Sequence, residues 1–402
     1  MKVLQVNCVY KEGSTGNIVY DIHQELLSRG DKSVVCYGRG KKNDEPFVYK
    51  TCGERYSKLN NAISRVSGII YGGCAFSTKK LISVIEKEKP DIVHLHCING
   101  YFVNIYKLVT YLKKVKQKTI LTLHAEFMHT ANCSHAYDCE KWKSGCGSCP
   151  RLKAATKSLF FDRTHSSWKK MKKAFDGFDE LRVISVSPWL MSRAKQSPIM
   201  KDLYHGVILN GLDTAVFTEK DVSSLKDKYN IGDEKIVFHA TPVFNDDKEN
   251  IKGGHYVIAL AEKMLEDNVK FIVAGKYPKN LIVPENMILL GKISEPEKLA
   301  QYYSLADLTV LASKRETFSM ICAESLSCGT PVVGFEAGAP EQISIPEYST
   351  FVKHGDVDAL HQAAKVILKK NLKVPVEVSH AWYDKKNMIN KYIDEYREML
   401  SK

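Results

Sequence analysis

Short runs of β-branched and other apolar residues alternate along most of the chain with longer amphipathic stretches. In the first half, strand-like runs cover 3–8, 33–37, 91–96, 119–124 and 182–187, and helical periodicity covers 16–29, 79–89, 104–116 and 167–176. The pattern restarts with strands at 236–240, 270–274, 287–290, 308–311 and 331–334, and with helices at 254–266, 295–304, 322–327 and 356–368. Such alternation is typical of βαβ units with a parallel sheet, so it predicts two doubly wound α/β domains.

The pattern breaks at "YHGVILNGLDTAVF", residues 204–217, where Gly, Asn and Asp interrupt the apolar runs. A chain of 402 residues suits two domains rather than one core. We therefore expect a first domain at 1–205 and a second at 206–379. The amphipathic segment 380–402 is expected to pack back on the first domain.

The charge is distributed unevenly. Residues 1–203 carry 34 Lys and Arg against 18 Asp and Glu, whereas residues 204–402 carry 24 against 28. This asymmetry indicates that the first half meets something anionic, although a solubilising surface is the alternative. Two lysine groups stand out: Lys113, Lys114, Lys116 and Lys118, and Lys169, Lys170, Lys172 and Lys173.

No stretch has the roughly 18 uncharged apolar residues of a membrane span. The N-terminal "MKVLQVNCVYKEG" resembles a first strand rather than a signal peptide. We therefore expect a cytoplasmic protein, in which the 11 cysteines are reduced thiols.

The stretch "KRETFSMICAESLSCGTPVVGFEAG" combines two carboxylates with a helix start. Phe318, Ser319, Met320 and Ile321 are expected to form the first turn of a helix, whose free N–H groups suit a phosphate. Glu316 would lie just before this turn and Glu324 within the helix, each able to accept hydrogen bonds from hydroxyls. A polyol with a diphosphate between its ends fits this layout. The alternative is that Glu316 only caps the helix.

A second candidate loop follows the first predicted strand, in "VYKEGSTGNIVYDIHQEL". Gly13 and Gly16 loosen the chain, and a helix opening at Gly16 and Asn17 would present N–H groups to a phosphate. The spacing is not GxGxxG and no Gly-Lys-Ser/Thr follows, so an ordinary turn is equally compatible.

Several motifs resemble those of retaining glycosyltransferases of family 4. "ETFSMICAESLSCGTPVVGFEAGAPEQI" resembles the paired-glutamate motif of that family, and "VILNGLDTAVF" resembles its interdomain signature. "DIVHLHCINGYFVNIYKL" and "LTLHAEFMHTANC" resemble first-domain motifs of a branch that builds bacterial surface polysaccharides such as O-antigen, capsule or exopolysaccharide. The resemblance spans essentially the whole chain. It implies the GT-B fold, with two Rossmann-like domains facing across a cleft and a C-terminal helix that crosses back.

The resemblance also implies roles for individual residues. Glu316 would bind the donor sugar's hydroxyls and Glu324 the ribose, while the N–H groups of 318–321 hold the distal phosphate. Lys252 matches the basic residue that neutralises the leaving diphosphate. The Arg that often accompanies it is missing, so Lys248 could substitute. Backbone near Ile293 would contact the base.

In the first domain, His124 matches a histidine that faces the donor sugar. Relatives often place an Asp after it, where this chain has Ala125. His96, at the end of another predicted strand, is a candidate on the acceptor side.

These roles imply a nucleotide-diphosphate-sugar donor, UDP- or GDP-linked, and a lipid-linked or oligosaccharide acceptor. Lys252 and the helix N-terminus would neutralise the diphosphate, so we expect no catalytic metal. The lysine groups suggest peripheral attachment to the anionic inner face of the cytoplasmic membrane. A nucleotide-sugar epimerase of the same fold remains an alternative. A nucleic-acid-binding protein would leave the second domain unexplained, so no nucleic acid partner is expected.

Four cysteines cluster in "NCSHAYDCEKWKSGCGSCPRL": Cys133, Cys139, Cys146 and Cys149. The Cys146–Cys149 spacing is that of a zinc knuckle, and four thiolates can close a structural zinc site. The wider Cys133–Cys139 spacing fits less well, and His129 or His135 could substitute. Reduced thiols that pack a loop and a disulfide are the alternatives.

Overall fold

The computed structural model describes residues 1–402, which divide into two compact units, each built around a parallel sheet. The first unit comprises Met1–Ile208 and Ile389–Lys402, and the second comprises Leu209–Met388. The chain therefore enters the second unit close to the expected residue 206. It returns later than the expected residue 380, because the helix Val376–Tyr383 still belongs to the second unit. None of the helices is both long and apolar enough to span a bilayer.

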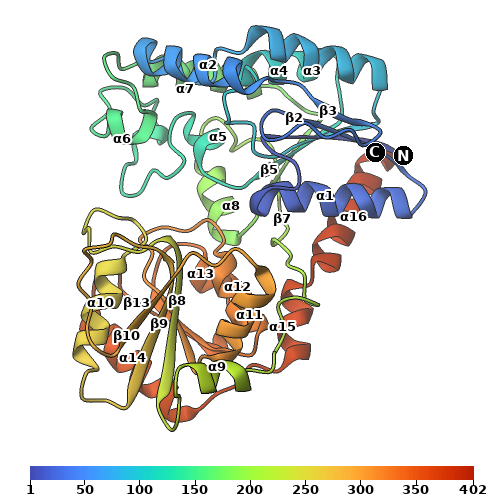
Figure 1. The fold of residues 1–402 in the computed structure, drawn as a ribbon. Coiled ribbons are helices and arrows are strands. Elements are labelled where there is room, and N and C mark those ends of the chain that lie inside the picture. Colours follow the sequence, from blue (N-terminus) through green and yellow to red (C-terminus); the bar gives the residue numbers. More distant parts are fainter. The chain divides into compact units, whose positions relative to one another are not determined.

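Seven parallel strands form the sheet of the first unit, in the order β3-β2-β1-β4-β5-β6-β7 (Figure 1). The strands are β1 (Lys2–Asn7), β2 (Lys32–Tyr37), β3 (Val48–Lys50), β4 (Ile92–Leu95), β5 (Thr119–Leu123), β6 (Leu181–Ser185) and β7 (Tyr204–Val207). The longer helices are α1 (Gly13–Ser28), α2 (Glu54–Ser67), α3 (Ala75–Glu88), α4 (Ile105–Lys114), α7 (Thr164–Phe175) and α8 (Pro188–Lys195). Shorter helical segments are α5 (Phe127–Thr130), η1 (Lys141–Lys143) and α6 (Leu152–Thr156). In Figure 1, α3, α4 and α7 lie on one face of the sheet, and α1 lies on the other with the C-terminal helix.

That C-terminal helix, α16 (Lys385–Ser401), presents tyrosines to the sheet of the first unit. The Tyr396 hydroxyl lies 2.6 Å from Nδ1 of His94, and the Tyr392 hydroxyl lies 3.0 Å from Oγ1 of Thr122. Both tyrosines are buried, so their hydroxyls need these partners. The expected packing of residues 380–402 on the first domain is therefore observed from residue 389 onward.

Six parallel strands form the sheet of the second unit, in the order β10-β9-β8-β11-β12-β13. They are β8 (Lys235–Val243), β9 (Val269–Lys276), β10 (Met287–Gly291), β11 (Leu308–Leu311), β12 (Val332–Phe335) and β13 (Ser349–Val352). The helices are α9 (Ser223–Lys228), α10 (Gly254–Lys263), α11 (Pro296–Leu305), α12 (Met320–Ser327), α13 (Pro340–Ile343), α14 (Val357–Lys370) and α15 (Val376–Tyr383), with the short η2 (Pro346–Tyr348). One core lies between the sheet and α10 with α14, and another lies between the sheet and α9 with α11.

The apolar pattern missed the edge strands β3, β7 and β13, and several helices, among them α2, α8 and α9. The edge strands have only three or four residues each, too few to establish a period. Residues 204–207 begin the stretch in which we expect the join between the domains, but they pair with β6 as the last strand of the first sheet. The helix α2 buries Ser57 and Ser64 and exposes its apolar side chains.

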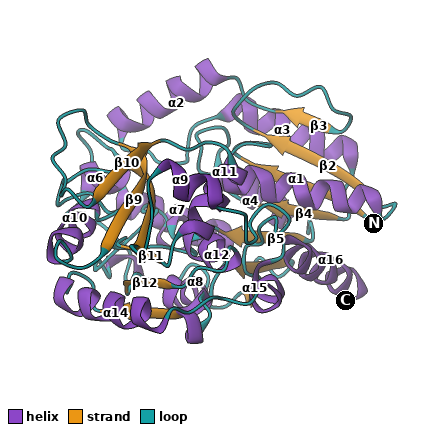
Figure 2. Ribbon diagram, turned by 60° about the horizontal axis from the view of Figure 1, so that its bottom comes forward, coloured by secondary structure: helices purple, strands orange, loops and turns teal.

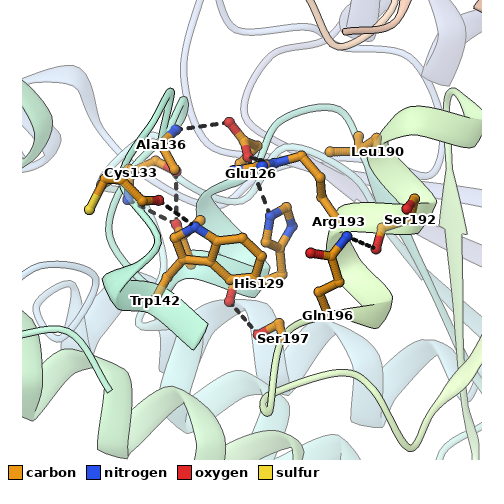
Figure 3. A network of polar contacts seen from close by, with 12 residues as sticks. Glu126, His129, Cys133, Ala136, Trp142, Leu190, Ser192, Arg193, Gln196 and Ser197 are labelled. Carbon is orange, nitrogen blue, oxygen red and sulfur yellow. Dashed lines mark hydrogen bonds and ion pairs between the residues drawn. The ribbon is translucent and has the colours of Figure 1, made fainter. Parts of the chain in front are cut away.

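A buried carboxylate anchors the segment that follows β5 (Figure 3). Glu126 is fully buried and pairs with the Arg193 guanidinium from α8, while its other oxygen accepts from Ala136 N–H at 2.8 Å. His129 Nε2 lies 3.6 Å from the same carboxylate, and its backbone carbonyl accepts from Ser197 Oγ at 2.6 Å. Burial by itself would raise the pKa of Glu126, but His129, Arg193 and the Ala136 amide lower it to about 2.

We predict that Glu126→Gln destabilises the first unit by about 3–5 kcal/mol, because it removes the buried partner of Arg193 and leaves the guanidinium only a 4.0 Å contact with the exposed Glu140. Urea unfolding followed by circular dichroism measures this loss. Asp44→Asn is the matched control, since the Lys42–Asp44 pair is 77% and 80% exposed and should leave stability unchanged. Equal unfolding curves for wild type and Glu126→Gln would contradict the anchoring role.

Candidate functional site

The strand order of the second sheet reverses between β8 and β11. In open α/β sheets, ligands bind beyond the carboxyl ends of the strands at such a reversal. Two loops start there: residues 244–253 after β8 and residues 312–319 after β11. Lys252 belongs to the first loop and Glu316 to the second, so the topology brings these two predicted residues to one place.

Lys252 and Glu316 form an ion pair in this structure. The lysine Nζ donates to Oε1 of Glu316 at 2.6 Å, and the two side chains remain 29% and 20% exposed. Glu316 therefore does more than cap a helix, because its carboxylate reaches across to the neighbouring loop. A partly exposed cation beside a carboxylate can bind both an anion and a hydroxyl.

Close backbone contacts hold the Lys252 loop against the end of β11. Gly253 adopts a φ of 68°, and a Cβ on it would lie 2.2 Å from the Ala312 carbonyl oxygen. Only glycine fits this position without displacing backbone. The Lys314 N–H donates to the Ile251 carbonyl at 2.8 Å, which joins the two loops directly.

The loop after β12 supports Glu316 from the other side. The Glu316 N–H donates to the Ala337 carbonyl at 3.0 Å, and the Glu316 carbonyl accepts from Ala339 N–H at 3.3 Å. Glu341 holds this loop by accepting from the N–H groups of Ala337 and Gly338, at 3.2 and 2.9 Å. Sequence reasoning assigned no role to Glu341, although it follows Gly338 and Pro340 in the quoted motif.

The helix α12 begins at Met320, so the expected first turn from Phe318 is too early. Ser319 is the N-cap, with a φ of 83°, and its Oγ accepts from Cys322 N–H at 3.3 Å. Phe318 is buried beneath the loop. The N–H groups of Met320 and Ile321 are therefore the first ones of the helix, where intrahelical acceptors are missing.

Glu324 lies further along α12, in surroundings that favour its neutral form. Its Oε2 accepts from the Tyr303 hydroxyl at 2.9 Å. Burial raises the pKa of Glu324 to about 7, although the Tyr303 bond lowers it in part. The sequence did not indicate Tyr303 as a partner, because it belongs to α11. Ile293 packs on the same side of the sheet, against the α9–α11 core.

Two of the predicted first-unit residues, His96 and His124, follow β4 and β5 and contact each other. Their Nδ1 and Nε2 atoms are 3.4 Å apart, and their rings stack with 5.7 Å between centroids. Gln5 donates its Nε2–H to the Val19 carbonyl, so its Oε1 accepts from His96 Nε2 at 3.2 Å. His96 Nδ1 then accepts the Nε2–H of His124. Burial lowers the pKa of His124 to about 4 and that of His96 well below its ordinary value, so both imidazoles are neutral at pH 7.

The phosphate loop expected at Gly13, Gly16 and Asn17 is wrong in one respect. The helix α1 begins at Gly13, so Gly16 and Asn17 lie inside it and their N–H groups bond along the helix. The first free N–H groups belong instead to 13–15. The Glu12 carboxylate also lies at this end of the loop, close to Gly40.

The four clustered cysteines are free thiols that line one small cavity, together with Trp142 and Thr164. Four successive residues with positive φ, Gly145 to Ser148, turn the chain between Cys146 and Cys149. Burial raises the pKa of Cys133 to about 12 and that of Cys146 to about 11. The structure shows no group of three or more His, Cys, Asp or Glu side chains set as metal ligands.

The sequence Asp356-Val357-Asp358 is an Asp-x-Asp triplet, and the structure gives it a local role. The Asp356 side chain caps α14 by accepting from Ala359 N–H at 2.9 Å. Asp358 pairs with Lys263 at 2.7 Å.

Comparison with known proteins finds a family that matches part of the second unit. Residues 238–370 match the family described as "Glycosyl transferases group 1". Over 99% of its length, the chain is 25% identical to the whole of the putative colanic acid biosynthesis glycosyl transferase WcaC of Escherichia coli K12. It is also 27% identical to N-acetyl-alpha-D-glucosaminyl L-malate synthase of Bacillus anthracis, over 40% of this chain and 44% of that protein.

Solved structures share the fold over the whole chain. Sucrose-phosphate synthase from Thermosynechococcus elongatus is similar with a TM-score of 0.69 and 16% identity, covering 100% of this chain and 99% of the other. Anabaena HepE, solved in complex with UDP, is similar with a TM-score of 0.65 and 15% identity, covering 99% and 100%. Residues 238–370, which include the Lys252–Glu316 pair, thus match the glycosyl transferases group 1 family, in a chain with the GT-B fold.

Proposed function

We propose that this protein is a retaining glycosyltransferase that moves a sugar from a nucleotide-diphosphate donor to a lipid-linked saccharide or oligosaccharide. The observation that carries the proposal is the Lys252–Glu316 pair at the strand-order reversal of a group 1 domain. The name of the E. coli relative, which refers to colanic acid, favours bacterial polysaccharide biosynthesis. The complexes of Anabaena HepE with UDP and with UDP-glucose favour a UDP- or related nucleotide-sugar.

The donor diphosphate would replace Glu316 as the ion-pair partner of Lys252. Lys252 Nζ would then bind the phosphate, while the freed Glu316 carboxylate accepts hydrogen bonds from sugar hydroxyls. The first N–H groups of α12 would bind the distal phosphate. Glu324 would accept from the ribose hydroxyls. This arrangement stabilises the leaving group by fixed donors, without a catalytic metal.

In the transfer step, the bond between the anomeric carbon and the phosphate oxygen breaks. The acceptor hydroxyl oxygen bonds to the same carbon on the same face, and its proton passes to the departing phosphate oxygen. The products are the retained glycoside and the nucleoside diphosphate. We propose that His124, which is neutral and bonded to His96, contacts the donor sugar. We propose that this occurs in the cytoplasm, at the inner face of the cytoplasmic membrane.

The test is a panel of nucleotide-sugars, first by thermal shift and then by transfer to a lipid-linked acceptor. A donor at 100 times its dissociation constant should stabilise the protein by about 2.7 kcal/mol. Glycoside formation only when acceptor is present supports the proposal. Interconversion of two nucleotide-sugars without acceptor would instead identify an epimerase.

We predict that Lys252→Ala and Glu316→Gln keep the fold and lower turnover by roughly 10²–10³-fold at saturating donor, the usual loss for one preorganised polar group. Steady-state transfer rates measure the effect. Lys263→Ala, which removes the exposed Lys263–Asp358 pair of the same unit, is the matched control. Near-normal turnover of either variant would rule out its assigned role.

We predict that stability falls as pH rises through about 7, because the folded protein favours protonated Glu324. Its folded pKa of about 7 exceeds the ordinary value of 4.5, so this contribution is complete below about pH 4.5. At high pH the loss approaches roughly 3 kcal/mol. Melting temperatures between pH 5 and 9 measure it. Glu324→Gln should flatten the profile, and Tyr303→Phe should move it to higher pH. Identical profiles for all three proteins would contradict the assignment.

We also propose structural zinc in the cysteine cavity, although its side chains are not set as metal ligands in this structure. Four thiolates that close on the ion would cross-link the two ends of the 133–149 segment. We predict one zinc per chain in freshly purified, reduced protein, while transfer survives EDTA. Elemental analysis measures the metal. Cys149→Ser should lose it, whereas Cys97→Ser, outside the cavity, should retain it. Zinc-free wild-type protein would identify the four cysteines as packing thiols. A requirement for added magnesium or manganese would contradict metal-independent transfer.

A further inference from the structure

The helix α2 has its polar side toward the protein and its apolar side toward solvent. The buried residues of α2 are two serines, Ser57 and Ser64. Leu59, Ile63 and Val66 are 57%, 53% and 52% exposed. Their spacing of four and three residues places them on one stripe of the helix. This is the reverse of the usual surface helix, whose apolar stripe faces the core.

Neighbouring segments extend this stripe into a larger surface. The exposed apolar side chains, which we call the apolar patch, are Leu59, Ile63, Val66, Ile69, Phe76, Leu159, Phe160 and Phe161. The Leu159 N–H donates to the Arg65 carbonyl at 2.8 Å, and the Phe161 carbonyl lies against Gly68. Phe76 is 79% exposed and contacts Tyr56 of α2, with ring centroids 6.1 Å apart. Soluble proteins rarely expose contiguous apolar surface of this kind without a partner.

Basic side chains accompany the apolar patch. The exposed cations on α2 and on the 157–163 segment are Arg55, Lys58, Arg65, Lys157 and Arg163. Against these, the same two segments carry only Glu54 and Asp162. An apolar stripe with Phe and Leu, bordered by Lys and Arg, is typical of helices that lie in the interface plane of an anionic bilayer.

We infer that the apolar patch docks this protein on an anionic lipid surface, with the α2 stripe inserted among the acyl chains and the cations at the headgroups. A second copy is a poorer occupant, because a symmetric contact would bring these cations together. In Figures 1 and 2, α2 lies at the periphery of its unit, where a flat surface can reach it.

The apolar patch also lies at the carboxyl edge of the first sheet, where a lipid-linked substrate would be bound. The helices α3 and α7 lead into β4 and β6, so their N-termini lie at the carboxyl edge of the sheet. Phe76 and Phe161 are at these N-termini, and His96 and His124 end β4 and β5 at the same edge. Docking would bring this edge close to the bilayer. Only the link between docking and a lipid-linked substrate rests on the proposed function.

The two lysine groups indicated by the sequence are less suited to membrane insertion than the apolar patch. Lys113 Nζ donates to the carbonyls of Lys173 and Asp176, and Lys118 Nζ donates to the Met399 carbonyl. Val115 is the one large apolar side chain exposed between them. These lysines satisfy helix ends and solvate the surface, but they offer little apolar area for insertion.

The test is flotation of the full chain with phosphatidylcholine vesicles, with and without phosphatidylglycerol, at low and high salt. We expect binding to the anionic vesicles that weakens with salt. The variant Leu59→Ser/Ile63→Ser/Val66→Ser should bind at least about tenfold more weakly. Two controls should bind as wild type: Ile282→Ser, at an 88% exposed position of the second unit, and Lys114→Gln/Lys169→Gln/Lys170→Gln.

Unchanged vesicle binding of the α2 variant would overturn the inference, as would equal binding to neutral vesicles. A change from dimer to monomer in the α2 variant, without any effect on vesicles, would instead identify a second copy as the occupant. Transfer to a short soluble acceptor is measured in parallel. Lost vesicle binding with normal soluble transfer supports docking, whereas absent transfer by wild type with every donor counts against the proposed function alone.

Discussion

The ion pair between Lys252 and Glu316 joins the two loops that diverge where the second sheet reverses its strand order. The surrounding backbone holds this contact in place. The left-handed conformation of Gly253 lets the Lys252 loop approach Ala312, and the backbone of Ala337 and Ala339 hydrogen-bonds to that of Glu316. The pair is partly exposed, so its net contribution to stability is small. An anion can therefore displace Glu316 from Lys252 with little loss of stability, and the Glu316 carboxylate can then accept hydrogen bonds from hydroxyls.

The Glu126–Arg193 pair has the opposite character. Both side chains are largely removed from water, and the carboxylate is also hydrogen-bonded to the Ala136 amide. A ligand could not displace this pair without leaving a buried charge. Glu126 and Glu316 look alike in the sequence, and their different burial gives them different roles. Glu316 is available to a ligand, whereas Glu126 holds α8 and the cysteine segment beside the end of β5.

Burial shifts the pKa values of His96, His124 and Glu324 toward the neutral form of each side chain. His124 donates to His96, and His96 donates to Gln5 Oε1, so the hydrogen bonds define which nitrogen carries the proton in each ring. Burial lowers the pKa values of both histidines. Glu324 has its pKa raised to about 7 by burial. Each shift arises because the side chain lies at a strand end or in a helix packed against other elements, not because of its neighbours in the chain.

The sequence by itself determined the two parallel sheets, since buried strands between amphipathic helices are visible as local periodicity. The ends of predicted strands also indicated His96 and His124, and the predicted start of a helix indicated Glu316, whereas Lys252 followed only from the resemblance to family 4 glycosyltransferases. Only the tertiary structure decided how these residues pair. Strand order brings β8 beside β11, and Glu341 and Tyr303 act through contacts between elements. The start of α1 at Gly13 and the outward apolar stripe of α2 were also beyond the sequence, because a period identifies a helix face without telling which way that face points.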